Sequence, residues 1–214
     1  ILKPIGELPL YKIVYNRVTS SECVDQVVFA TTEKSVDDVF CNRLDNEKIG
    51  YFRGSETNVS SRYRGCAEFF QADNIVRITC DDPFKDPKII DQCLKPLVHG
   101  EIDFSSNVIE PSFAEGLDVE CFTRSLLEEM DEVSSQAYQR EHVTPYFYEN
   151  KERFNTILSE VKIFAQEVND SLNVSDDIEK FKIFRIYRDL RFSKDKTPYK
   201  KNIGMAFHRS KPEL

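Results

Sequence analysis

The sequence predicts an α/β protein with a three-layer α/β/α arrangement around a mostly parallel sheet. Strand-like and helix-like segments alternate from residue 10 to residue 108, and this β-α-β-α order is typical of parallel sheets with helices on both faces. The strand segments 27–32 and 74–79 are largely apolar and β-branched, as expected of buried parallel strands. An Asp-rich turn bounded by proline follows the second of them, at the sheet edge where such folds bind ligands.

The individual elements follow from local patterns along the chain. Leu10, Ile13, Val14 and Val18 share one face of a predicted helix. After strand 27–32, Ser35 is predicted to cap a helix with Asp38 at the third position beyond it. The remaining expected elements are, in order, a strand at 49–52, a helix at 59–70, a strand at 74–79, a helix at 87–98 and a strand at 102–108.

Composition indicates a globular chain. The 214 residues are 40% hydrophobic and carry a net charge of −8, which suits one large or two small cores. No apolar run reaches the roughly 18 residues of a membrane span, and no signal-peptide pattern opens the chain, so we expect a cytoplasmic protein. The six cysteines form no CxxC pair and are expected to be reduced and mostly buried.

Charge divides the chain into two predicted units, 1–148 and 149–214. Residues 1–150 carry 15 Lys and Arg against 27 Asp and Glu, whereas residues 151–214 carry 14 against 10. An amphipathic helix is predicted over residues 154–172, followed by the basic motif FRIYRDLRFSKDKTPYK at 184–200. Interleaved basic and aromatic residues suit nucleic acid, but we favour a solvated basic hairpin and expect no nucleic-acid partner.

The turn after strand 74–79 carries the chemistry. Asp81 is the leading candidate ligand for Mg²⁺, with Asp82 and Asp86 behind it, because Mg²⁺ typically takes one or two protein carboxylates and fills its other positions with water and phosphate oxygens. The alternative is structural, since Asp-x-Pro and Asp-Pro are also ordinary turn and helix-start signals.

Seven ordered segments resemble the bacterial cytidylyltransferase-like family that includes the spore coat polysaccharide biosynthesis protein F. More distantly, they resemble the acylneuraminate and ketodeoxyoctonate cytidylyltransferases. The segments are KPIGELPL (3–10), VVFATT (27–32), FRGSETNVSSRY (52–63), RITCDDPFKDP (77–87), SSNV (105–108), EGLDVECF (115–122) and REHVTPYFY (140–148). The basic motif at 184–200 resembles a second family, a bacterial domain of unknown function, which we expect to be cut short in this sequence.

The first resemblance implies a nucleotide-diphospho-sugar-transferase-like sheet, followed by a partial α+β unit. It implies a bacterial transferase that uses CTP and Mg²⁺ to transfer CMP to a sugar for surface polysaccharide or glycan synthesis. The family's first strand and phosphate loop are expected upstream of Ile1, so the sheet would lack its first strand and keep a gap or an unpaired edge. We therefore expect this chain to bind CTP weakly and to show no turnover.

The resemblance also implies roles for particular residues. Asp81 is the expected metal ligand, and Asp81 and Arg77 are the expected catalytic residues, with Arg77 pairing with Asp81 or touching phosphate. Asp118, Glu120 and Gly116 are the expected cofactor-binding residues. Asp118 and Glu120 would provide a second carboxylate or bind sugar hydroxyls, and Gly116 suits a close backbone approach or a turn with positive φ. Each has an alternative from the pattern alone: a structural ion pair for Arg77, and a solvated strand face for Asp118 and Glu120.

Two further positions carry weaker expectations. Arg62 matches a family Asp-Arg-Tyr position, but Ser61 replaces the Asp, which weakens an ion-pair role. His142 beside Glu141 is more often an ordered hydrogen-bonded residue than a base. The alternative function is a non-enzymatic binding or structural module that acts through the basic C-terminal motif. The expected partners are nucleotide and sugar small molecules and no membrane; the oligomeric state stays open, a homodimer included.

Overall fold

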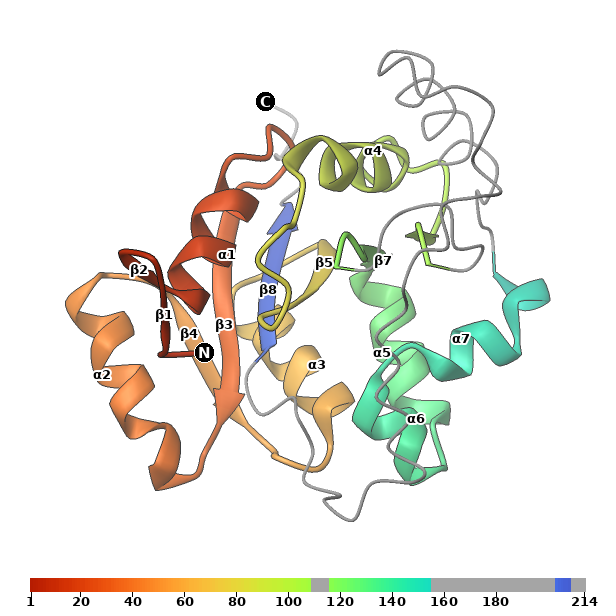
Figure 1. The fold of residues 1–214 in the computed structure, drawn as a ribbon. Helices are drawn as coiled ribbons and strands as arrows, with labels where there is room; N and C mark the ends of the chain where they lie inside the picture. The colour runs from red at the N-terminus through yellow and green to blue at the C-terminus, as the bar shows by residue number, and fades with distance from the viewer. Residues whose placement is uncertain (109–115, 155–202, 209–214) are drawn as a thin grey trace, which may run out of the picture.

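The fold is built on a six-stranded mixed sheet with helices on both faces (Figure 1). The computed structural model describes residues 1–108, 116–154 and 203–208. Strand order in the sheet is β4-β3-β8-β5-β7-β6, and a separate hairpin joins β1 to β2. The strands are β1 Pro4–Ile5, β2 Leu8–Pro9, β3 Gln26–Thr32, β4 Tyr51–Gly54, β5 Asn74–Thr79, β6 Phe104–Ser106, β7 Glu120–Thr123 and β8 Ile203–His208.

The strand directions confirm the predicted α/β class. β3 and β4 pair in parallel, and β8 runs antiparallel to both β3 and β5, so β5 points the same way as β3. β7 is antiparallel to β5 and to β6, which gives β6 the same direction again. The four predicted strands therefore lie in one sheet with one direction, and the two reversed strands, β7 and β8, make the sheet mixed.

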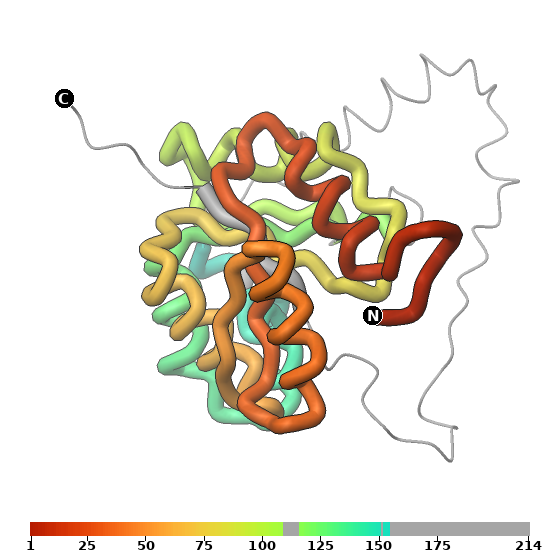
Figure 2. The backbone as a smooth tube through the Cα atoms, turned by 90° about the vertical axis from the view of Figure 1, so that its left-hand side faces the viewer, coloured from red at the N-terminus to blue at the C-terminus, as the bar shows by residue number. Residues whose placement is uncertain are grey.

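Helices cover the two faces in separate groups, which forms three layers. Side chains of α1 (Leu10–Thr19), α2 (Asp38–Asn46) and α4 (Pro87–Val98) pack with Val27, Phe29 and Val76 on one face. Helices α3 (Val59–Phe69), α5 (Arg124–Val133), α6 (Ala137–His142) and α7 (Pro145–Glu149) lie on the other face. Figure 2 shows α1 and α2 on the opposite side of the strands from α3.

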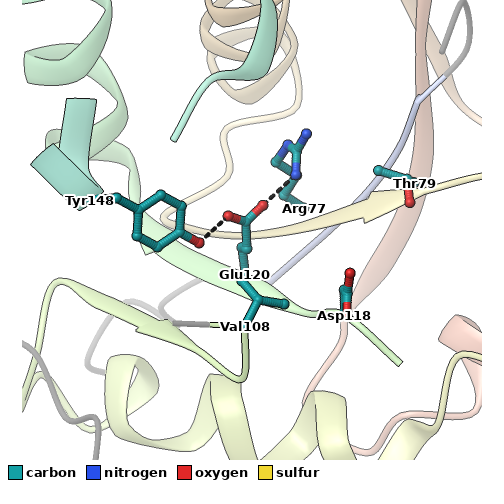
Figure 3. A pocket seen from close by; sticks show the side chains of 6 residues that line it. All are labelled: Arg77, Thr79, Val108, Asp118, Glu120 and Tyr148. Atoms are coloured by element: carbon teal, nitrogen blue, oxygen red, sulfur yellow. Dashed lines mark hydrogen bonds and ion pairs between the residues drawn. The ribbon is translucent and has the colours of Figure 1, made fainter. Parts of the chain in front are cut away.

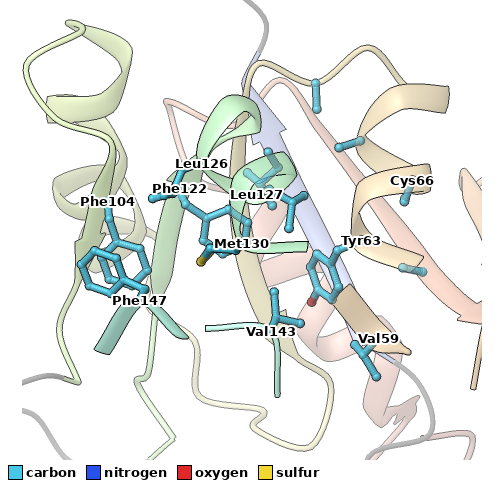
Figure 4. Packing of buried hydrophobic residues seen from close by; sticks show 14 of the residues in the cluster. Val59, Tyr63, Cys66, Phe104, Phe122, Leu126, Leu127, Met130, Val143 and Phe147 are labelled. Carbon is cyan, nitrogen blue, oxygen red and sulfur yellow. The ribbon is translucent and has the colours of Figure 1, made fainter. Parts of the chain in front are cut away.

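Alternation along the strands produces these two cores. Val28 and Ala30 of β3 are fully buried against the α3 and α5 layer, while Val27 and Phe29 turn to the α1, α2 and α4 side. Figure 4 shows α3 and α5 packing together over the sheet through Tyr63, Leu127 and Met130. Five of the six cysteines are buried, which confirms the expectation of burial.

The expected gap in the sheet is filled. β8 lies between β3 and β5 and pairs along both of them, with Val28 opposite Met205 and Val76 opposite Ala206. The expectation of a gap or an unpaired edge is therefore wrong for the described sheet. The physical reason is that both facing edges present unpaired N–H and C=O groups, and one strand between them satisfies both. That strand comes from the C-terminal part of the chain, and the division of the chain at residue 148 stays a prediction.

Some local predictions were wrong in detail. Ser35 does not cap a helix, because residues Ser35–Asp37 form a 3-10 turn and α2 begins at Asp38. The Asp37 carboxylate accepts hydrogen bonds from the Thr31 hydroxyl at 3.0 Å and from the Thr32 N–H at 3.2 Å, so it ties the turn to the end of β3. The predicted helix 154–172 and the basic motif 184–200 lie outside the described residues. Within the described part of the chain, no helix is long and apolar enough to cross a membrane.

Candidate active site at the end of β5

A small polar cavity lies where β5 and β7 run side by side. Its volume is about 160 Å³, and it is lined by Arg77, Thr79, Val108, Asp118, Glu120 and Tyr148. Arg77 and Thr79 are two residues apart on β5, so their side chains lie on the same face of the sheet. Arg77 is directly opposite Glu120 of β7. Figure 3 shows Arg77 and Tyr148 converging on Glu120, with Thr79 and Asp118 at the other end of the cavity. The structure thus brings three predicted residues together: Arg77, Asp118 and Glu120.

Glu120 is the centre of the hydrogen-bond network. Its side chain is buried and forms an ion pair with the Arg77 guanidinium. The Thr144 hydroxyl donates to Glu120 Oε1 at 2.8 Å, and the Tyr148 hydroxyl donates to the same oxygen. A buried carboxylate with three donors is well compensated. The interpretation of Glu120 as part of a solvated strand face is therefore wrong.

The electrostatics fix the charge state of this network. Burial alone would raise the pKa of the Glu120 carboxyl, but Arg77 and the hydroxyls of Tyr148 and Thr144 hold that pKa below its usual value. Burial opposes the charge of Arg77 as well, yet Glu120 raises the pKa of its guanidinium. Burial, followed by the charge of Glu120, raises the pKa of Tyr148. Glu120 is thus an anion, and Tyr148 is a neutral donor.

The three carboxylates of the Asp-rich turn lie in different environments. Asp82 accepts from the Thr79 hydroxyl at 2.9 Å and from the Lys85 ammonium at 3.1 Å. Asp86 caps α4 by accepting from the Lys88 N–H at 2.8 Å. Asp81, by contrast, is exposed at the carboxyl end of β5. The exposed side chain is the one the sequence places first as a metal ligand.

The donor set at this turn fits Mg²⁺ bound through very few protein groups. Among the described residues, no group of three or more His, Cys, Asp or Glu side chains could hold a metal by itself. Mg²⁺ does not need such a cage, because it is commonly held by one or two carboxylates together with water and substrate phosphates. An exposed Asp81 beside a polar cavity matches that mode of binding.

The segment before β7 closes the other side of the cavity. Asp118 is exposed and precedes the strand, while Val119 is buried. Gly116 has φ +96°, which confirms the predicted need for glycine, because other residues rarely adopt this conformation. Asp118 and Glu120 therefore line the same cavity in different ways, one at its exposed mouth and one at its buried end.

Arg77 forms its ion pair with Glu120, which fits the alternative of a structural ion pair for this residue.

The two weaker candidates, Arg62 and His142, are not among the residues that line the cavity. Arg62 is 1% exposed and donates from Nη1 to the Ser55 carbonyl at 2.8 Å, while its Nε and Nη2 have no hydrogen-bond partner among the described residues. Burial accordingly lowers the pKa of Arg62. His142 is exposed.

Three residues of the site were missed by the sequence reasoning: Thr144, Tyr148 and Lys85. The first two belong to the segment REHVTPYFY, in which Glu141 and His142 are considered as candidates from the sequence. Lys85 lies inside the metal turn, where a lysine among aspartates is easily taken for a solvated neighbour. A hydroxyl-bearing residue directly before a proline and another on the following turn was the available signal for Thr144 and Tyr148.

A mixed sheet with a carboxylate turn and a polar cavity at the carboxyl end of β5 is typical of the ligand-binding α/β folds. Comparison with known proteins gives the family. Residues 1–202 match the cytidylyltransferase family, and the chain belongs to it.

Two curated relatives share most of the chain. An uncharacterized protein of Methanocaldococcus jannaschii, MJ1063, is 32% identical over 186 residues, which is 86% of this chain and 74% of that protein. The spore coat polysaccharide biosynthesis protein SpsF of Bacillus subtilis is 28% identical over 188 residues, 80% of this chain and 77% of SpsF.

Solved structures agree with this assignment. A cytidylyltransferase from Leptospira borgpetersenii serovar Hardjo-bovis has a TM-score of 0.69 and 35% identity, covering 73% of this chain and 66% of that one, just under two thirds of its length. CMP:2-keto-3-deoxy-manno-octonic acid synthetase in complex with CTP has a TM-score of 0.53 at 12% identity, covering 81% and 91%. At that identity the likeness concerns the fold alone.

Proposed function

We propose that this protein is a Mg²⁺-dependent nucleotidyltransferase that transfers CMP from CTP to a sugar for surface polysaccharide or glycan synthesis. The observation that carries the proposal is the exposed carboxylate of Asp81, two residues beyond Thr79, the last residue of β5 and part of the lining of the cavity. The family membership supports CTP as the nucleotide, and the name of the Bacillus relative supports the polysaccharide context.

In this proposal the two sides of the cavity have separate tasks. Asp81 would hold Mg²⁺, which neutralises charge on the α- and β-phosphates of CTP. An oxygen of the sugar forms a bond to the α-phosphorus of CTP. The bond between the α-phosphorus and the oxygen that bridges it to the β-phosphate breaks, and pyrophosphate leaves. Most of the catalysis in such a transfer is positioning and charge stabilisation.

The residues opposite the metal turn would orient the sugar. Glu120 is an anion already engaged by three donors, so it acts as a fixed anchor that orients Arg77 and Tyr148. Asp118 at the exposed mouth can accept hydrogen bonds from sugar hydroxyls, and Gly116 lets the backbone turn sharply toward the cavity. Arg77 offers its remaining donors to phosphate or to a sugar oxygen.

Nucleotide selection and transfer test the proposal in one set of measurements. Ligand-observed NMR with Mg²⁺ should show CTP bound in preference to UTP, ATP and GTP. Pyrophosphate release should then be followed with CTP and a panel of neutral, amino and acidic sugars. Equal binding of all four nucleotides, or no binding of any, contradicts the proposal. Pyrophosphate release with one class of sugar supports the proposal and identifies that class as the acceptor.

A further inference from the structure

Lys85 is a buried cation inside the proposed metal turn. Its side chain is 1% exposed, although lysine is almost never fully buried unless it is paired. Its ammonium donates to Asp82 Oδ2 at 3.1 Å and to the backbone carbonyl of Asp118 at 2.8 Å. The side chain therefore joins the turn after β5 to the segment before β7.

The surrounding contacts hold this arrangement in place. The Lys85 carbonyl accepts from Arg17 Nε of α1 at 2.6 Å, which fixes the backbone of the turn. The oxygen of Asp82 that meets the ammonium also accepts from the Thr79 hydroxyl at 2.9 Å. Asp82 could bind a metal through that oxygen only by giving up two charge-assisted hydrogen bonds, each of which stabilises the carboxylate in its present position.

We propose that Lys85 is a positioning residue that keeps Asp82 out of metal coordination. Asp81 is then the carboxylate of the turn that binds the metal. The inference rests on the proposed function, because the metal concerned is the one that function needs. Asp81 and Asp82 are consecutive carboxylates, and without a cation beside Asp82 both would attract a divalent ion. By neutralising one of them, Lys85 lowers the negative charge of the turn and so limits metal affinity in the absence of nucleotide.

Direct binding of Mn²⁺, measured as loss of the free-ion electron paramagnetic resonance signal, tests this without any turnover. In Lys85→Met the side chain stays unbranched and is one atom shorter, but it loses its charge, so Asp82 becomes available. We expect Mn²⁺ to bind roughly three- to tenfold more tightly than to the wild-type chain, as one additional nearby charge predicts. The double variant Lys85→Met/Asp82→Asn restores the charge balance and should return to the wild-type affinity.

The single variants keep the inference falsifiable if Lys85→Met does not fold. Asp82→Asn leaves the Lys85 charge unbalanced and should weaken Mn²⁺ binding by no more than roughly three- to tenfold, whereas Asp81→Asn should abolish most of it. A merely structural role for Lys85 would lower thermal stability without tightening Mn²⁺ binding. Unchanged or weaker Mn²⁺ binding by a folded Lys85→Met chain, or equal losses in Asp82→Asn and Asp81→Asn, would overturn the inference. Failure of the proposed function would appear separately, as an absence of CTP selection by the wild-type chain.

Discussion

Glu120 shows how a single residue determines the chemistry of the cavity. It combines a buried position with one ion pair and two hydroxyl donors, so the carboxylate is stable as an anion only while its partners are present. Removal of one member of a buried pair leaves the other charged and unpaired, which costs more than the pair contributed. The orientation of Arg77 and Tyr148 toward the cavity therefore depends on Glu120.

Glu120→Gln is expected to lower the free energy of unfolding by about 3 kcal/mol, because Arg77 is left without its counter-ion. Urea unfolding at neutral pH measures this value. Glu132→Gln is the matched control, since Glu132 is exposed, and its effect should stay within about 0.5 kcal/mol. Equal stability of the two variants would show that the buried ion pair does not stabilise the fold.

Acid unfolding should depend on the same residue. The pKa of Glu120 in the folded chain lies below the ordinary value of 4.5, so its stabilising contribution is present above that pH and is lost as pH falls through the folded pKa. The wild-type chain should therefore lose stability more steeply below about pH 4.5 than Glu120→Gln does. Parallel pH profiles for the two chains would contradict the assigned charge state.

The short helix α7 shows the same dependence at the scale of an element. With only five residues, it is too short to be stable by itself and depends on Phe147. The ring of Phe147 is fully buried and stacks on Phe104, with ring centroids 3.6 Å apart and planes at 13°. Thr144 immediately precedes the helix, and Tyr148 is its fourth residue. The anchoring of one aromatic ring thus places both hydroxyls on Glu120.

Phe147→Ala is expected to destabilise the chain by about 3–5 kcal/mol, the usual range for truncating a buried phenylalanine to alanine. Thermal or urea unfolding gives the value. Phe84→Ala is the control, because Phe84 is 69% exposed and its loss should change stability by less than about 0.5 kcal/mol. If the two variants behave alike, α7 is not held by this contact.

At the scale of the whole molecule, the sheet depends on β8. This strand pairs with β3 on one side and β5 on the other, so it joins the β4–β3 half of the sheet to the β5–β7–β6 half. Residues that are more than a hundred positions apart in sequence must therefore meet before the sheet is complete. Such distant pairing is slow to form and exposes strand edges until it does.

Ala206→Pro should disrupt this joint, because proline removes a backbone donor and cannot be accommodated in a central strand. We expect a loss of about 3 kcal/mol or more in the free energy of unfolding. Ala206→Gly keeps the N–H and should cost only about 1 kcal/mol. A proline variant as stable as the glycine variant would show that β8 does not occupy the centre of the sheet in solution.

The sequence was most informative where the signal is local. The apolar β-branched segments predicted β3 and β5, the proline-initiated helix 87–98 coincides with α4, and the turn with Asp81 lies at the expected sheet edge. The antiparallel pairing of β8 between β3 and β5 could not be predicted. It depends on which distant segment of the chain forms hydrogen bonds with the facing edges of both strands. Tyr148 and Thr144 were missed for the same reason, since only the packing of Phe147 brings them to Glu120.

Asp81 is proposed to bind nucleotide through a divalent metal at the end of β5. Calorimetric titration of CTP into the wild-type chain, with and without Mg²⁺, tests it most directly, with Asp81→Asn as the variant and Asp86→Asn as the control from the same turn. We predict weak binding that requires Mg²⁺, is lost in Asp81→Asn and is retained in Asp86→Asn, because Asp86 only caps α4. Binding that is the same without Mg²⁺, or that survives in Asp81→Asn, would contradict the claim.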